Sequence, residues 1–284
     1  MNRIKIFLIA FIIILFSIGS NPVNPFSVVK SEKEVKARVT FIGNSGFVVE
    51  TGGKKISIDA MFKGFPGRYT LPDKAVKKIR TSSPPFDNID VILATHLHAD
   101  HLKTGYVSDY LVKNKSSRFI STYEVVDTMK KNLPEFILYK ERVKGLKLEW
   151  GDTEEININN INIRGLGMPH GSNPVTQAAF LVRINKKRFL HLGDVAGDKV
   201  EWVFRTASMK KEKIDIAFIP YWFLTKEKYV KLIEKYIHSK YIVTIHLGLT
   251  DRGENKEEII KKINTNFPDA IIFDKELQSK VFLL

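Results

Sequence analysis

The stretch THLHADH, residues 95–101, holds three imidazoles and one carboxylate within seven residues. It directly follows an apolar run at residues 90–94 that predicts a buried strand. In an extended chain His96 and His98 point to the same side, so both can bind one ion. Asp100 and His101 follow where the chain turns, and they can face a second ion. Without pairing or a metal, so many ionisable groups at the end of a core strand would be costly in free energy.

Three further candidate ligands lie far along the chain, each at the carboxyl end of an expected strand. They are His170, Asp194 and His246. An open α/β architecture gathers its site at the carboxyl ends of its strands. We therefore expect these side chains to join the cluster at residues 95–101. Each of them taken singly could be structural, and a non-catalytic binding protein on a degenerate scaffold is one alternative.

Short alternating or apolar runs predict the rest of the fold. Three early strands are expected at residues 38–42, 47–51 and 55–59, with glycine-bearing turns between them. The middle of the chain predicts strands at 119–121, 155–164, 177–184 and 188–191, strand pairs at 142–150 and a helix at 123–132. The last part alternates strands at 214–220, 241–246 and 270–273 with helices at 226–238 and 254–264. This order favours two sheets with helices on the outside.

The order of the candidate ligands resembles the metallo-β-lactamase-fold superfamily of metal-dependent hydrolases. Its signature is His-x-His-x-Asp-His, followed by a lone His, an Asp and a final His. The resemblance spans roughly residues 37–284, and residues 43–54 are similar to a broad subgroup of uncertain substrate. It implies an α/β fold, the four-layer αββα sandwich of the metallo-β-lactamase type.

The resemblance also implies a role for each matching position. Two divalent metal ions are expected, with three ligands for the first, three for the second and one shared carboxylate. In that order the ligands are His96, His98 and His170, then Asp100, His101 and His246, and finally the bridging Asp194. Nitrogen and oxygen ligands suit Zn²⁺, with Mn²⁺ or Fe²⁺ as alternatives.

The implied reaction is hydrolysis by a metal-bound hydroxide, which would attack an ester, amide, lactone or phosphodiester bond. Asp100 is the expected catalytic residue: it would orient the hydroxide and pass a proton to the leaving group. Asp59, which ends an early strand, resembles a family residue that steadies a ligand histidine through a hydrogen bond. The alternative for Asp59 is a strand-end carboxylate that accepts from turn amides.

Other activities fit the sequence less well. A phosphodiesterase acting on phospholipid-like or nucleic-acid substrates is the main alternative. The diiron oxidoreductases of the superfamily carry Glu where this chain has His98. A true β-lactamase is disfavoured, because those enzymes generally lack a bridging carboxylate like Asp194 and several use a cysteine ligand.

The first twenty residues differ in kind from the rest. A short basic segment precedes an apolar run at residues 6–18, which small residues follow. This pattern predicts a signal peptide or an N-terminal membrane anchor at residues 1–20, a linker at 21–36 and the hydrolase domain at 37–284. The domain is therefore expected to be exported, either secreted or periplasmic or anchored to the outer face of the cytoplasmic membrane.

Composition limits the chemistry and the partners. The chain has no cysteine, which excludes disulfides, thiolate ligands and a cysteine nucleophile. Its formal net charge is +14, but the lysines are scattered singly or in pairs, as on a solvated surface. We expect a small-molecule or lipid-like substrate rather than nucleic acid, and membrane association only through residues 1–20. The oligomeric state is not predicted.

Several other residues are left outside the predicted site. His191 is interpreted as structural, and His238 as a solvent-facing residue late in a helix. Residues 221–223, Tyr-Trp-Phe, predict either an apolar wall at the rim of the site or an aromatic plug in the core. Arg68 could bind an anionic group.

Overall fold

The computed structural model describes residues 35–171, 174–248 and 255–284. The predicted signal peptide or anchor at 1–20 and nearly all of the predicted linker lie outside the described residues. Within those described ranges, no helix has the length and apolar character that a membrane crossing requires.

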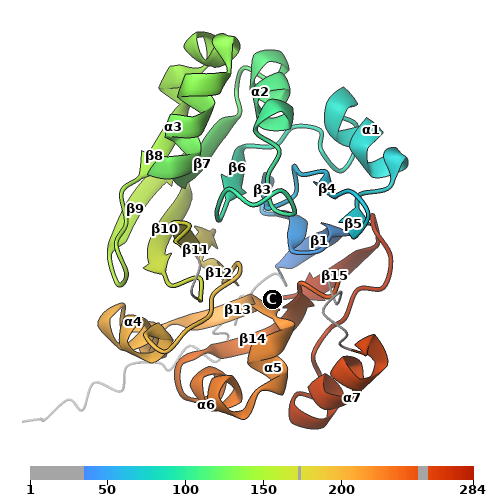
Figure 1. Ribbon diagram of the computed structural model, residues 1–284, viewed down its shortest axis with the longest axis vertical. Coiled ribbons are helices and arrows are strands. Elements are labelled where there is room, and N and C mark those ends of the chain that lie inside the picture. Colours follow the sequence, from blue (N-terminus) through green and yellow to red (C-terminus); the bar gives the residue numbers. More distant parts are fainter. Residues whose placement is uncertain (1–34, 172–173, 249–254) are drawn as a thin grey trace, which may run out of the picture. The chain divides into compact units, whose positions relative to one another are not determined.

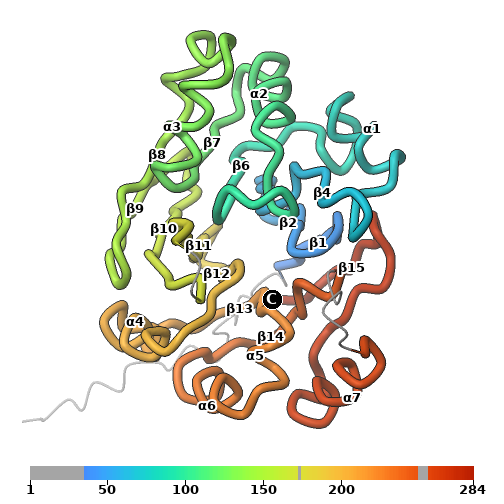
Figure 2. The backbone as a smooth tube through the Cα atoms, viewed as in Figure 1, coloured from blue at the N-terminus to red at the C-terminus, as the bar shows by residue number. Residues whose placement is uncertain are grey.

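The first sheet has seven strands in the order β15-β1-β2-β3-β6-β7-β8. Strands β1 to β3 form an antiparallel meander, and β3, β6, β7 and β8 are parallel neighbours. Figure 2 shows the chain returning at its carboxyl end, where β15 pairs antiparallel with β1. The strands are β1 Lys36–Gly43, β2 Gly46–Thr51, β3 Lys54–Ile58, β6 Val91–Ala94, β7 Arg118–Thr122, β8 Val143–Leu146 and β15 Ser279–Leu283.

The second sheet has six strands in the order β14-β13-β12-β11-β10-β9. Strands β9 to β12 are antiparallel, and β12, β13 and β14 are parallel. The strands are β9 Thr153–Ile158, β10 Ile161–Met168, β11 Gln177–Ile184, β12 Lys187–His191, β13 Lys213–Pro220 and β14 His238–Ile245. A small separate hairpin pairs β4 Gly64–Phe65 with β5 Tyr69–Thr70.

Helices cover the outer face of each sheet, as Figure 1 shows. The first sheet carries α1 Asp73–Thr81, α2 Thr104–Lys113 and α3 Tyr123–Asn132, and the second carries α4 Val200–Thr206, α5 Tyr221–Thr225, α6 Glu227–Tyr236 and α7 Lys256–Asn266. Between the sheets lies a third apolar layer, in which the rings of Phe47 and Phe218 are 4.6 Å apart. The four-layer αββα sandwich is therefore confirmed.

Some expected elements differ from those observed. Residues 155–164 are not one strand but parts of β9 and β10, because Asn159 and Asn160 take positive φ and turn the chain. Residues 142–150 contain only β8, and residues 270–273 contribute one isolated bridge from Ile271 to Val243. The helix expected at 226–238 ends at Tyr236, and α7 begins two residues later than expected.

Candidate metal centre

The predicted ligands follow the carboxyl ends of four strands, which lie at one edge of the sandwich. Strand β6 leads directly into residues 95–101, whereas His170, Asp194 and His246 follow β10, β12 and β14. Strands β10, β12 and β14 all run in one direction, so their carboxyl ends lie at the same edge. The topology therefore places these strand ends together.

The first group comprises His96, His98, His170 and Asp194, whose ligand atoms all lie within 4.8 Å of one another. Nε2 of His96 is 3.0 Å from Nδ1 of His98 and 3.3 Å from Nε2 of His170. The Oδ2 atom of Asp194 lies 4.0 Å from His96 Nε2 and 3.9 Å from His170 Nε2. These four side chains could hold one cation.

The second group comprises Asp100, His101, Asp194 and His246, again within 4.8 Å. Nε2 of His101 is 3.1 Å from Oδ1 of Asp194, and Nε2 of His246 is 3.1 Å from its Oδ2. Nε2 of His246 also lies 3.3 Å from Oδ2 of Asp100. Asp194 is the one side chain that belongs to both groups.

Several of these atoms lack the partners that buried polar groups normally have. Nε2 of His101 and Oδ1 of Asp194 are buried and meet in an orientation that forms no hydrogen bond among the described residues. Both ring nitrogens of His246 are in the same condition. Buried polar groups normally have a partner, and a bound cation would provide one for these atoms. The donor set of imidazoles and carboxylates fits divalent transition metals.

The electrostatics of the site separate its histidines into two kinds. Burial, reinforced by the neighbouring His101, holds the pKa of His96 well below its ordinary value, so its imidazole is neutral and can bind a metal. Burial alone would also lower the pKa of His101 and His246, but Asp194 and Asp100 outweigh it. These carboxylates raise the pKa of His101 well above its usual value and that of His246 to about 9.

The two carboxylates remain ionised for the complementary reason. Burial would raise the pKa of Asp194, but His101 and His246 hold that pKa well below its ordinary value. The same two histidines lower the pKa of Asp100 against its burial. A compact array of negative oxygens and imidazoles therefore faces one small volume.

Asp59 and Thr95 fix the orientation of two of the histidines. Oδ2 of Asp59 accepts hydrogen bonds from Nδ1 of His101 at 2.8 Å and from Oγ1 of Thr95 at 2.7 Å. Because the hydroxyl of Thr95 donates its hydrogen bond to Asp59, its oxygen accepts from Nδ1 of His96 at 2.9 Å. The neutral ring of His96 then presents an unprotonated Nε2 to the centre, and the ring of His101 turns its Nε2 towards Asp194.

Two further residues, which were not predicted from the sequence, support the site. Nδ2 of Asn44 donates to Oδ2 of Asp100 at 2.8 Å. The backbone carbonyl of Asn44 accepts from the backbone amide of His246 at 3.1 Å. Oε1 of Gln177 accepts from the backbone amide of Asp194 at 3.0 Å. The available signals were a glycine-flanked Asn in a turn and a Gln that opens an apolar strand.

The residues left out of the predicted site fall outside both groups. His191 is fully buried, and its Nε2 donates to the carbonyl of Ser45 at 2.8 Å. His238 is exposed as expected, but it begins β14 and does not lie in a helix. Residues 221–223 divide between the two interpretations. The Trp222 ring lies 5.1 Å from that of His246, whereas Phe223 is fully buried. Arg68 lies over the ring of Phe65.

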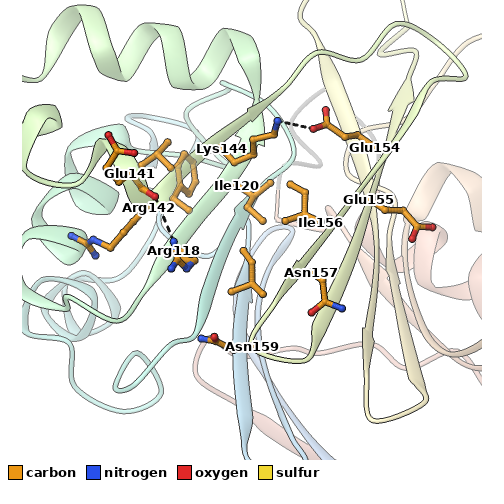
Figure 3. Close-up of a pocket in the computed structure, with 13 residues that line it drawn as sticks. Arg118, Ile120, Glu141, Arg142, Lys144, Glu154, Glu155, Ile156, Asn157 and Asn159 are labelled. Carbon is orange, nitrogen blue, oxygen red and sulfur yellow. Dashed lines mark hydrogen bonds and ion pairs between the residues drawn. The ribbon is translucent and has the colours of Figure 1, made fainter.

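One large hollow lies away from this centre. Figure 3 shows it between β7 and β8 on one side and β9 on the other, with Lys144 paired to Glu154 at 2.7 Å across it. Its volume is about 550 Å³, and its lining includes Arg118 at the amino end of β7. None of the seven candidate ligands lines it.

Comparison with known proteins supports the fold and the family. The family model described as Beta-lactamase superfamily domain matches residues 54–265. A UPF0173 metal-dependent hydrolase of Heliobacterium modesticaldum is 24% identical over 82% of this chain and 91% of its own length. Another, from Pyrococcus abyssi, is 25% identical over 64% of this chain and 71% of its own. A metallo hydrolase from Ignicoccus hospitalis superposes with a TM-score of 0.57 at 17% identity, covering 87% and 98% of the two chains.

The αββα sandwich and the site at its edge define a protein of the metallo-β-lactamase fold. The chain belongs to the β-lactamase superfamily of metal-dependent hydrolases with this fold, because the family model covers most of its length.

Proposed function

We propose that the chain is a binuclear metal-dependent hydrolase. One observation supports this most strongly: two groups of four potential ligands share Asp194 and face each other across it. Each group would hold one cation, and Asp194 would contribute a carboxylate to both. Zinc is the proposed metal, because imidazole nitrogens and carboxylates with no cysteine suit it.

Two such cations, when bound, would lower the pKa of a water molecule towards ~7 and stabilise the negative charge that develops on an oxygen of the substrate. The chain's own residues then handle the proton. The carboxylate of Asp100 is held by Asn44, and we assign it to take a proton from the attacking water and deliver it to the leaving group. Asp59 and Thr95 keep the rings of His101 and His96 in place during this transfer.

The proposed substrates are esters, amides, lactones and phosphodiesters, since hydrolysis of each develops negative charge on an oxygen. A small-molecule or lipid-like compound is favoured over nucleic acid. Export through residues 1–20 is part of the same proposal and rests on the sequence of that segment.

Elemental analysis of the purified full chain tests the centre. The wild type should contain about two equivalents of divalent metal, and His96→Ala and Asp194→Ala should each lose metal and nearly all turnover. His238→Ala is the matched control, because this histidine is exposed and belongs to neither group. Full hydrolysis by metal-free protein would overturn the proposal. A screen of the zinc-loaded chain against ester, lactone, β-lactam and phosphodiester reporters would identify the substrate class.

A further inference from the structure

A second hollow lies against chain segments that lead to the candidate centre. Its volume is about 570 Å³, within the ~300–1,000 Å³ range of small-molecule sites. The chain between β8 and β9, the end of β10, the approach to β11 and helix α4 enclose it. The residues that matter here are Leu148, Trp150, Met168, Pro174, Gln177 and Trp202.

Two of these residues join the hollow to the centre. Gln177 lines the hollow, and its side chain accepts from the backbone amide of Asp194 at 3.0 Å. Met168 also lines it and precedes His170 by two positions. The hollow therefore adjoins the segments that carry Asp194 and His170, although none of the seven candidate ligands lines it.

The walls of the hollow are tryptophans that the fold leaves uncovered. Trp150 is 51% exposed and Trp202 is 43% exposed, although large apolar side chains normally lose most of their surface to the core. Figure 1 shows α4, which carries Trp202, beside the chain that links β8 to β9 and carries Trp150. Exposed aromatic groups beside a catalytic edge are typical of a ligand-binding surface.

The wall that carries Trp150 is held in place by close backbone contacts. Gly151 has a φ of 88°, and a Cβ there would lie 2.9 Å from the ring of Trp202. Its amide donates to the carbonyl of Gly167 at 3.0 Å, and Gly167 donates back to the carbonyl of Asp152 at 3.0 Å. A Cβ at Gly167 would meet the carbonyl of Glu149. The hollow is therefore built into the fold.

Its charge also limits what it can hold. The ionisable side chains of the lining are Glu149 and Lys199, which are opposite in sign. A phosphate chain needs several cationic or amide donors. The lining therefore favours an uncharged apolar group over a nucleotide.

We infer that this hollow binds the apolar acyl or aryl portion of the substrate, with the scissile bond at the neighbouring centre. This inference rests on the proposed function, since it names the substrate class of the same site. Trp150 and Trp202 are the residues that determine this specificity.

Binding of an uncharged fluorescent probe, N-phenyl-1-naphthylamine, to the full chain tests the inference without turnover. Trp150→Ala and Trp202→Ala should each lower the affinity for the probe about tenfold, because each removes an aromatic ring from the lining of the hollow. Trp202→Phe should restore binding to within about twofold of the wild type. Ile137→Ala is the matched control, because Ile137 is 63% exposed and does not line this hollow. Competition by octanamide and by benzamide distinguishes an acyl from an aryl ligand.

Equal probe affinity in the wild type and in both Ala variants, with unchanged melting temperatures, would overturn the inference. Hydrolysis gives the second readout. With straight-chain esters, kcat/KM should rise about fourfold per added methylene in the wild type and much less in Trp202→Ala. If no ester, amide, lactone or phosphodiester is cleaved but probe binding still depends on the tryptophans, the proposed function fails and the apolar site stands. If esters are cleaved with the same chain-length dependence in both proteins, the apolar site fails alone.

Discussion

Nδ1 of His101 donates a hydrogen bond to Oδ2 of Asp59 across 2.8 Å, and both side chains are fully buried. The carboxylate also accepts from the backbone and the hydroxyl of Thr95, both at 2.7 Å. This arrangement turns Nε2 of His101 towards Asp194. A histidine held in this way binds a metal with a fixed tautomer and ring orientation.

Asp59→Asn should therefore weaken the binding of the second metal ion, because the substitution keeps the shape of the side chain but removes its charge. Loss of such a partner typically lowers metal affinity about 10- to 100-fold. Metal titration should show one site weakened and the other close to that of the wild type. Asp274→Asn, at an exposed position, is the control. Unchanged metal affinity at both sites would show that Asp59 acts only as a strand-end carboxylate that accepts from turn amides.

Asn44→Gly should lower kcat at least about tenfold while two metal ions stay bound, because it removes the donor to Asp100 at 2.8 Å. Glycine is chosen since Asn44 has a φ of 46°, where alanine would add backbone strain. Steady-state kinetics with parallel metal analysis separates the two effects. Loss of metal in step with activity would instead make Asn44 a support of the ligand set.

Metal binding near pH 7 should release protons. The carboxylates raise the pKa of His101 and raise that of His246 to about 9, so both are protonated in metal-free protein at pH 7. Each must lose its proton to become a ligand. As the pH rises through about 9, His246 loses its proton before the metal binds, so it should no longer contribute to the proton release. Calorimetry in buffers of different ionisation enthalpy measures this release, and a buffer-independent enthalpy at pH 7 would contradict it.

Phe218→Ala should destabilise the sandwich by about 3–5 kcal/mol, as large core truncations do. Phe218 is fully buried between the sheets, where its ring lies 4.6 Å from that of Phe47. Denaturant unfolding of the metal-loaded chain measures the loss. Ile137→Ala at the surface should change stability by less than about 0.5 kcal/mol. A Phe218 variant as stable as this control would refute the layer assignment.

Much of the architecture could be predicted from the sequence, because the candidate ligands directly follow apolar runs that form strands. Strand β6 leads into residues 95–101, and β11 has the predicted limits because polar turns bound its apolar run. The four-layer assignment came from the resemblance, whereas periodicity alone indicated two sheets with outer helices. The structure now brings the seven predicted ligands into two adjacent groups.

Other features depend on contacts that local patterns do not reveal. Strand β15 is mostly exposed and exists through its pairing with β1, more than two hundred residues earlier in the chain. Asn44 and Asp100 follow β1 and β6 of the first sheet, whereas Gln177 begins β11 and Asp194 follows β12 in the second sheet. These contacts depend on the strand order within each sheet, which a local sequence pattern does not give. The Asn159-Asn160 turn was missed although these two adjacent Asn residues interrupt the alternation of Ile and polar residues.

Anomalous diffraction at the zinc edge, on crystals of the zinc-loaded full chain, tests the central claim most directly. We expect two peaks about 3.5–4 Å apart, with the carboxylate of Asp194 between them. One peak should contact His96, His98 and His170, and the other the second group. A single peak, or a pair that Asp194 does not bridge, would contradict the account.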